Sequence, residues 1–311
     1  MHEEAMQETR MPARERTSSG MLRKELDMRL TAYLPAVVRR HLERQDMHKP
    51  LSMPTTHRTT VVSMFADVSG FTAMTESLAA RGPVGAEDLA KHLNSYFEQL
   101  LRLVSSAGGD VFKFAGDAML IFWPESKEDT MDSLLRRALQ CALRIQSHLH
   151  EAELAQGVVL SVKVGVGIGE ATIAHLGGES DGATARIEYV AVGPALEQAF
   201  NSEHQAEAGD VICSRECWQR VSEFFDGAPT QNHGGEHGSN GFYKVTGVNK
   251  PVKICSRRPS FTRHDALLHA RMKQYVSRAV WPYLDAHDEF WGSELRDVTV
   301  LFINLGFRYA S

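Results

Sequence analysis

Two aspartates, Asp67 and Asp117, stand where we expect elements of the chain to end, and both could hold a divalent cation. Asp67 follows residues 61–65, a short and mostly apolar run typical of a buried strand. Beyond it, Ser69 and Gly70 predict a turn into a helix, where backbone N–H groups and the helix dipole favour an anion. Because Asp67 would repel a phosphate, the pattern indicates a cation between them, and so a combined metal and phosphate site.

The second aspartate lies beside a predicted β-hairpin. Residues 109–114 and 118–123 have the composition of its two strands, and residues 115–116 of its turn, so Asp117 is expected just past the tip. Divalent ions prefer oxygen ligands, and two ions held ~3.5–4 Å apart can activate an attacking oxygen and stabilise a leaving one. On spacing alone, Asp67 could equally cap a helix and Asp117 could equally form a turn.

A resemblance to a known family rests on two stretches, FADVSGFTAMTE at residues 65–76 and FKFAGDAMLIFW at residues 112–123. They resemble the paired metal-binding signatures of class III nucleotidyl cyclases, most closely the first catalytic half of soluble, bicarbonate-responsive adenylyl cyclases. The likeness runs from about Thr59 to Val248. It implies an α+β, ferredoxin-like catalytic domain over residues 59–250, with a mixed or antiparallel sheet flanked by helices, that forms cyclic AMP and pyrophosphate from ATP.

The resemblance also implies a role for individual residues. Asp67, the Val68 carbonyl and Asp117 would bind two divalent cations, Mg²⁺ or alternatively Mn²⁺ or Ca²⁺. Lys113 matches the lysine that binds bicarbonate, although a solvated strand-edge lysine is the plainer interpretation, and the family's partnering arginine falls on Phe200. One cation without its partner predicts a weak anion pocket, which puts bicarbonate sensing in doubt. The phosphates would be cradled by backbone groups of Val68, Ser69, Gly70, Phe71 and Thr72.

An internal repeat indicates a second copy of the domain. Residues 272–307 echo residues 28–71: an amphipathic helix, a charged linker and then an apolar strand. We therefore expect a linker helix and the truncated start of a second copy over residues 265–311. Asn304 stands there in place of Asp67, and an uncharged amide is a poor substitute at a two-metal site. The first copy would hold the metals.

The family places an adenine-selecting lysine and a transition-state asparagine and arginine on the facing half, which here would lie beyond Ser311. In the first copy the asparagine position is Glu197 and the arginine position is Asn201, so a homodimer would lack the needed cation. The chain is expected to need a second cyclase half, in cis or in trans, and to be inactive alone. Alternatives are a catalytically silent dimerisation or regulatory module, a guanylyl cyclase, and a diguanylate cyclase suggested by residues 108–110, although Val111 replaces an expected acidic residue.

The elements that must position these residues follow from periodicity. Apolar stripes at helical spacing and short apolar runs predict three helices, over 86–105, 131–150 and 194–206, and further strands over 160–169, 171–177 and 187–192, the first two as a hairpin.

Composition bounds the remaining possibilities. The chain has 311 residues, of which 43% are hydrophobic. Its net charge of -5 gives no basic surface of the kind that binds nucleic acid. No run reaches the ~20 apolar residues of a membrane span. We expect a cytoplasmic protein with free thiols at its four cysteines. Residues 1–20 predict a disordered lead, residues 21–58 a helical segment broken at Pro35, and residues 231–241 a glycine-rich loop.

Overall fold

The computed structural model describes most of the chain between residues 29 and 285. The described residues are 29–46, 49, 51, 53–70, 74–76, 78, 81–155, 158–177, 186–230, 241–253, 266–285 and 299. The expected disordered lead, nearly all of the glycine-rich loop, Cys255 and most of the expected second copy, including Asn304, lie outside them.

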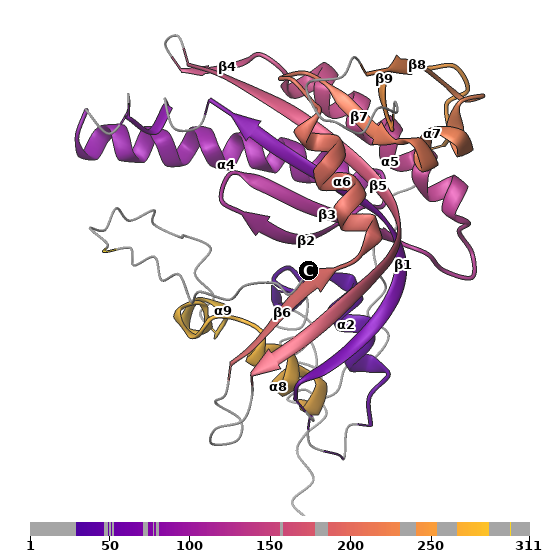
Figure 1. The fold of residues 1–311 in the computed structure, drawn as a ribbon. Helices are drawn as coiled ribbons and strands as arrows, with labels where there is room; N and C mark the ends of the chain where they lie inside the picture. The colour runs from indigo at the N-terminus through magenta and orange to yellow at the C-terminus, as the bar shows by residue number, and fades with distance from the viewer. Residues whose placement is uncertain are drawn as a thin grey trace, which may run out of the picture.

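The fold is built on one mixed sheet (Figure 1). Among the strand pairs of the described residues, only the contact between β5 and β7 is parallel, and the other pairs are antiparallel. The sheet order is β2 (Asp110–Ala115), β3 (Ala118–Pro124), β1 (Thr55–Ser69), β5 (Val158–Gly177), β7 (Val211–Ser214), β9 (Phe242–Val248) and β8 (Phe225–Pro229), with β4 (Ala152–Ala155) and β6 (Ile187–Val192) also paired to β5. The predicted α+β class with a mixed sheet is confirmed.

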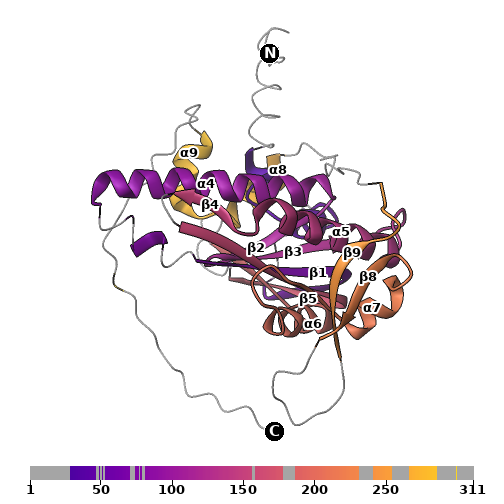
Figure 2. The ribbon, with the colours of Figure 1, turned by 90° about the horizontal axis from the view of Figure 1, so that it is seen from above.

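Helices cover both faces of the central strands. Figure 2 shows α4 (Pro83–Ser106) and α5 (Met131–Leu149) on one side and α6 (Pro194–His204) on the other. Proline stands in the first turn of α4 and of α6, and the Thr130 hydroxyl caps α5 by accepting from the Ser133 N–H. The described residues also form α2 (Ala36–Glu43), α7 (Arg215–Val221), α8 (Ala266–Gln274), the short 3-10 helix η2 (Arg278–Val280) and α9 (Trp281–Asp285).

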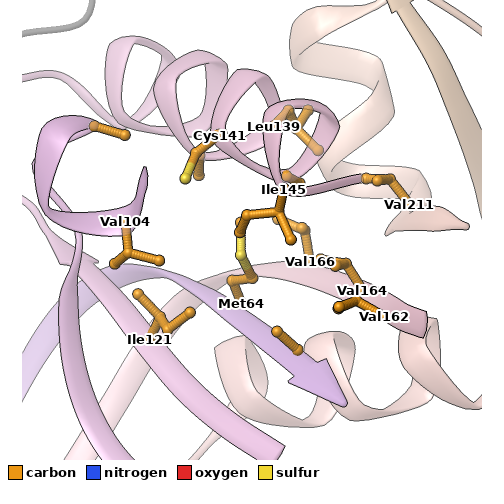
Figure 3. Close-up of a cluster of buried hydrophobic side chains, with 14 of the residues drawn as sticks. Met64, Val104, Ile121, Leu139, Cys141, Ile145, Val162, Val164, Val166 and Val211 are labelled. Carbon is orange, nitrogen blue, oxygen red and sulfur yellow. The ribbon is translucent and has the colours of Figure 1, made fainter. Parts of the chain in front are cut away.

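Side-chain alternation along β1 divides the core in two. Met64 and Ala66 are fully buried beneath α4 and α5, in a cluster that Figure 3 shows closing around Ile121, Ile145 and Val164. Odd-numbered residues of β1 face the other way, because successive strand side chains point to opposite faces. Phe65 therefore packs with the second cluster, to which α2, α6 and α8 contribute, and Asp67 shares its face.

The predicted hairpin between residues 160–169 and 171–177 is wrong. These residues form one strand, β5, because β1 is longer than the apolar run 61–65 and pairs with β5 continuously from Thr55 to Ser69. Turn-forming glycine at 169 is accommodated within the strand. Asp67 consequently lies inside β1 rather than beyond its end.

Two other expectations are confirmed for the described residues. The helix break at Pro35 is present, since that residue is the N-cap of α2. Cys141, Cys213 and Cys217 are free and buried, and burial raises the pKa of Cys141 and of Cys217 to about 12. Among the described residues, no helix is long and apolar enough to span a bilayer.

Candidate functional site

The structure places Asp67 and Asp117 at the same end of two neighbouring strands. Asp67 is near the end of β1, and Asp117 lies in the two-residue turn that joins β2 to β3, where Gly116 adopts a φ of 67°. The last register pair of β1 with β3 is Ala66 with Met119, so each aspartate is within two residues of it. Both are partly exposed, and both are open to a ligand from solvent.

A lysine that the sequence analysis did not single out completes this site. Lys163 of β5 is the register partner of Asp67, and its ammonium lies 3.3 Å from Asp67 Oδ2. The same ammonium forms an ion pair with the buried carboxylate of Glu203 on α6. Burial would lower the pKa of Lys163, but hydrogen bonds and charge from Glu203 and Asp67 outweigh it and raise that pKa. Lys163 therefore carries a positive charge beside Asp67.

Lys163 did leave a signal in the sequence. It is the one charged residue in the apolar run 158–168, and a lysine there needs a partner once the strand is buried. Its partner could not be read from the chain, because Asp67 is 96 residues away and only the register of β1 against β5 joins them.

A tight turn follows Asp67 at Ser69 and Gly70. The Ser69 hydroxyl donates to the Ser161 carbonyl at 3.2 Å, and Gly70 adopts a φ of 95°. A Cβ on Gly70 would lie 2.5 Å from the Val159 carbonyl oxygen, so only glycine fits. The Met74 N–H donates to the Gly70 carbonyl at 3.1 Å and begins a helical turn. Of the predicted cradle, Phe71 and Thr72 lie outside the described residues.

Lys113 and Phe200 both have structural partners of their own. Lys113 is half-exposed; it donates to the Tyr189 carbonyl at 3.1 Å and lies 3.9 Å from Glu188, both on β6. Phe200 packs edge-on against Phe65 at 4.8 Å between ring centroids. The structure thus gives Lys113 an acidic neighbour and puts an aromatic contact where the family has an arginine.

The donor set suits a hard divalent cation. Two carboxylates and the backbone carbonyls beside them are the oxygen ligands that such ions take. The Val68 side chain is buried in the core, so only its carbonyl could contribute. Any cation on Asp67 has to displace or share the Lys163 ammonium, which already neutralises that carboxylate.

Comparison with known proteins gives one family and several relatives. Residues 53–233 match the family described as the adenylate and guanylate cyclase catalytic domain. The chain is 30% identical over 272 residues to adenylate cyclase type 10 of Mus musculus, and 27% identical over 280 residues to that of Homo sapiens. Each alignment covers 79% of this chain and 16% of the relative, so the chain spans about a sixth of these proteins.

Solved structures share the fold at lower identity. The adenylyl cyclase CyaB from P. aeruginosa superposes with a TM-score of 0.53 at 20% identity, covering 64% of this chain and 100% of that one. The guanylate cyclase domain of RhGC from Catenaria anguillulae, solved with GTP, gives a TM-score of 0.50 at 22% identity over 62% of this chain and 99% of that one.

Proposed function

Because this chain belongs to the family of adenylate and guanylate cyclase catalytic domains, we propose that it is the metal-binding half of a nucleotidyl cyclase that forms cyclic AMP and pyrophosphate from ATP. The proposal is supported by the position of Asp67 and Asp117 at the same end of neighbouring strands, with Lys163 paired to Asp67. We propose ATP rather than GTP as the substrate because the curated relatives are adenylate cyclases. A structural relative was solved with GTP, so guanylyl cyclase activity is the alternative.

Each residue of the site has a task in this proposal. Asp67, Asp117 and the Val68 carbonyl hold two divalent cations, with Mg²⁺ as first candidate and Mn²⁺ or Ca²⁺ as alternatives. When bound, these ions supply activation of the ribose 3′-hydroxyl and neutralise charge on the phosphates. Backbone N–H groups around Gly70 bind the β- and γ-phosphates. Lys163 holds Asp67 in place before binding, and its positive charge is then available to a phosphate oxygen.

The proposal includes a second cyclase half as partner. Glu197 and Asn201 are exposed on α6, and neither is the asparagine or arginine that the resemblance requires. A cation that offsets charge on the phosphates must come from elsewhere, in cis beyond Ser311 or in trans. Bicarbonate regulation is not part of the proposal, because Lys113 is beside Glu188 and the arginine position is Phe200.

The test is cyclic nucleotide formation by the longest natural protein that contains residues 1–311. Asp67→Asn and Asp117→Asn should each lower ATP turnover at least about 100-fold, since loss of several kcal/mol of charge stabilisation corresponds to that factor. Asp132→Asn is the matched control, because Asp132 pairs with Arg220 on the exposed surface of α5. Unchanged turnover in both site variants would overturn the proposal.

A catalytically silent regulatory module is the second candidate, and the identities of Glu197 and Asn201 favour it. The same assay separates the two. If the longest protein makes neither cyclic AMP nor cyclic GTP with Mg²⁺ or Mn²⁺, even when mixed with a complete second cyclase half, the module is the better description.

A further inference from the structure

Three histidines from three separate elements meet far from Asp67. His41 lies on α2, His57 on β1 and His175 on β5, and one ring nitrogen of each comes within 4.8 Å of one on each of the others. His57 precedes Asp67 by ten residues on the same strand, which is roughly 30 Å of extended chain. Figure 1 shows α2 and α8 gathered at this end of β1 and β5.

We propose that His41, His57 and His175 bind one late first-row transition-metal ion, with Zn²⁺ as the expected ion. Imidazole nitrogens suit Zn²⁺, Co²⁺, Ni²⁺ and Cu²⁺, whereas Mg²⁺ prefers oxygen. His175 Nε2 and His57 Nδ1 are 3.1 Å apart. Two nitrogens bound to one tetrahedral zinc at ~2.0–2.1 Å would be separated by roughly 3.3 Å, so this pair needs little movement.

Hydrogen bonds on the outer nitrogens provide an independent argument. The Tyr275 hydroxyl lies 2.9 Å from His175 Nδ1, and the Gln45 side-chain amide lies 2.8 Å from His41 Nε2. Histidines that bind metals usually have their other ring nitrogen hydrogen-bonded, because that bond fixes the tautomer and the ring orientation. These partners leave His175 Nε2 and His41 Nδ1 for an ion.

The three rings are stacked, so an ion can bind only after a ring turns. The ring centroids of His41 and His57 are 4.2 Å apart with planes 9° from parallel. A ligand nitrogen must aim its lone pair within the ring plane, so His41 has to turn toward the ion. His41 and His57 are partly exposed, so His41 can turn if the Gln45 side chain moves with it, whereas His175 is 0% exposed and is fixed by its strand and Tyr275.

An ion needs a free lone pair on one ring nitrogen of each histidine, and neutral imidazole is the form that has one. The proton that His57 Nδ1 and His175 Nε2 share has to leave as the ion enters: its N–H bond breaks and an N–H bond forms at His57 Nε2, so the cluster keeps the same number of protons. Arg44, which also lowers the pKa of His41 and His57, opposes the incoming charge.

An ion here would join the two helical segments to the sheet. His41 lies on α2, and Tyr275 directly follows α8, which packs on α2. Arg271 of α8 also donates to the Asp46 carbonyl, just beyond the end of α2, at 3.0 Å. A ligand that binds only the folded chain stabilises it in proportion to its concentration and affinity. Zinc would therefore strengthen the docking of α2 and α8 on the cyclase domain.

The test is a titration of chelator-treated protein with Co²⁺ and Zn²⁺. Tetrahedral Co²⁺ absorbs visible light, and competition with a chromophoric chelator gives the zinc stoichiometry and affinity. We expect one ion per chain, with affinity lowered at least about tenfold in His41→Ala and about tenfold in Tyr275→Phe. His148→Ala is the matched control, because His148 is exposed on α5 and bonds Ser147 nearby. Asp67→Asn should also leave binding unchanged, which separates this site from the proposed magnesium site.

Two results would overturn the proposal: no ion bound by the unaltered chain at micromolar concentrations, or equal affinity in the unaltered chain, His41→Ala and His57→Ala. His41 is partly exposed, so its alanine variant should fold, and circular dichroism checks this. The melting temperature supplies a second measurement. It should rise with zinc concentration in the unaltered protein and stay constant in His41→Ala.

Discussion

The two ends of the β1–β5 strand pair carry opposite kinds of polar cluster on the same face. At one end Asp67, Lys163 and Glu203 form a charged row that is open to solvent on one side. At the other end His57 and His175 are neutral and stacked. The backbone is alike at both ends, so the difference comes from partners and burial. A buried side chain stays charged where an opposite charge lies beside it, and a buried imidazole stays neutral where no opposite charge lies beside it.

A different helix packs over each end. α6 approaches β5 so closely that a Cβ on Gly165 would lie 2.1 Å from the Ala199 carbonyl oxygen, and this approach sets Glu203 against Lys163. α2 is anchored instead at its N-terminus, where the Ala36 N–H donates to Asp110 Oδ2 at 2.5 Å. Because separate helices fix the two clusters, changes at one end should leave the other intact, and the predictions below address each end separately.

The largest expected effect is a loss of folding stability at acidic pH, caused by His57 and His175 at the histidine end of the strand pair and measured in the presence of a chelator. The pKa of His57 is about 4 in the folded chain and about 6.5 when unfolded, so between these values only the unfolded chain binds the proton. Stability present above pH 6.5 is therefore lost as the pH falls toward 4, by up to about 3 kcal/mol from His57 alone. His175 adds to this, while His41, Arg44 and the Tyr275 hydroxyl are the groups facing the pair.

The measurement is urea unfolding at intervals from pH 7.5 to 4, comparing the unaltered chain with His57→Gln. The variant should show a shallower loss of stability over this range. Parallel curves for the two proteins would mean that His57 is protonated equally well in the folded chain, and the contrast between a neutral and a charged end would fail.

The second effect is the loss of Lys163. Lys163→Met should lower the free energy of unfolding by about 2–3 kcal/mol, because it leaves Glu203 buried without its partner. Arg58→Met is the matched control: Arg58 and Glu170 pair on the same two strands, but both are exposed, so the cost should be below about 1 kcal/mol. Urea unfolding at pH 7 measures both. Equal costs would show that α6 does not bury the charged end as described.

A smaller effect is expected for Tyr275→Phe in chelator-treated protein. The variant removes the hydroxyl that bonds buried His175, and leaving that nitrogen without a partner should cost about 1–2 kcal/mol. Tyr33→Phe is the control, because Tyr33 is 41% exposed. Thermal unfolding compares the two. A shift no larger than that of the control would mean that the hydroxyl contributes nothing to the histidine end.

Asp67 and Asp117 could be singled out from the sequence because each lies in a recognisable local pattern. Asp67 and Gly70 share one stretch and Asp117 lies in the turn of a hairpin, although Asp67 proved to lie inside β1 rather than beyond its end. Lys163 lies beside Asp67 because of the register of β1 against β5, and Glu203 lies beside Lys163 because α6 approaches β5 closely. Neither contact leaves a local pattern in the sequence. The helices and the mixed sheet followed from periodicity, whereas β5 was divided at Gly169 because a glycine within a strand looks like a turn.

The histidine end was not predictable at all. His41, His57 and His175 are separated by 16 and 118 residues, with no spacing typical of a metal motif, and they meet because β1 and β5 are antiparallel and α2 packs beside them. Each is an ordinary amphipathic residue in its own segment. Long-range pairing creates such clusters, and a single sequence carries little trace of it.

The smallest effect is expected at Lys113, close to the charged end but on β2. Lys113→Met should change stability by less than about 1 kcal/mol, because its contacts with Glu188 and the Tyr189 carbonyl are exposed. Bicarbonate should leave cyclase activity of the longest natural protein unchanged, with or without the variant, since Glu188 competes with an anion and Phe200 offers no second cation. Turnover measured with and without bicarbonate at fixed pH and ionic strength decides this. Activation that disappears in Lys113→Met would show that one lysine suffices to bind the anion. It would also mean that the charged end includes Lys113 and its neighbours on β6.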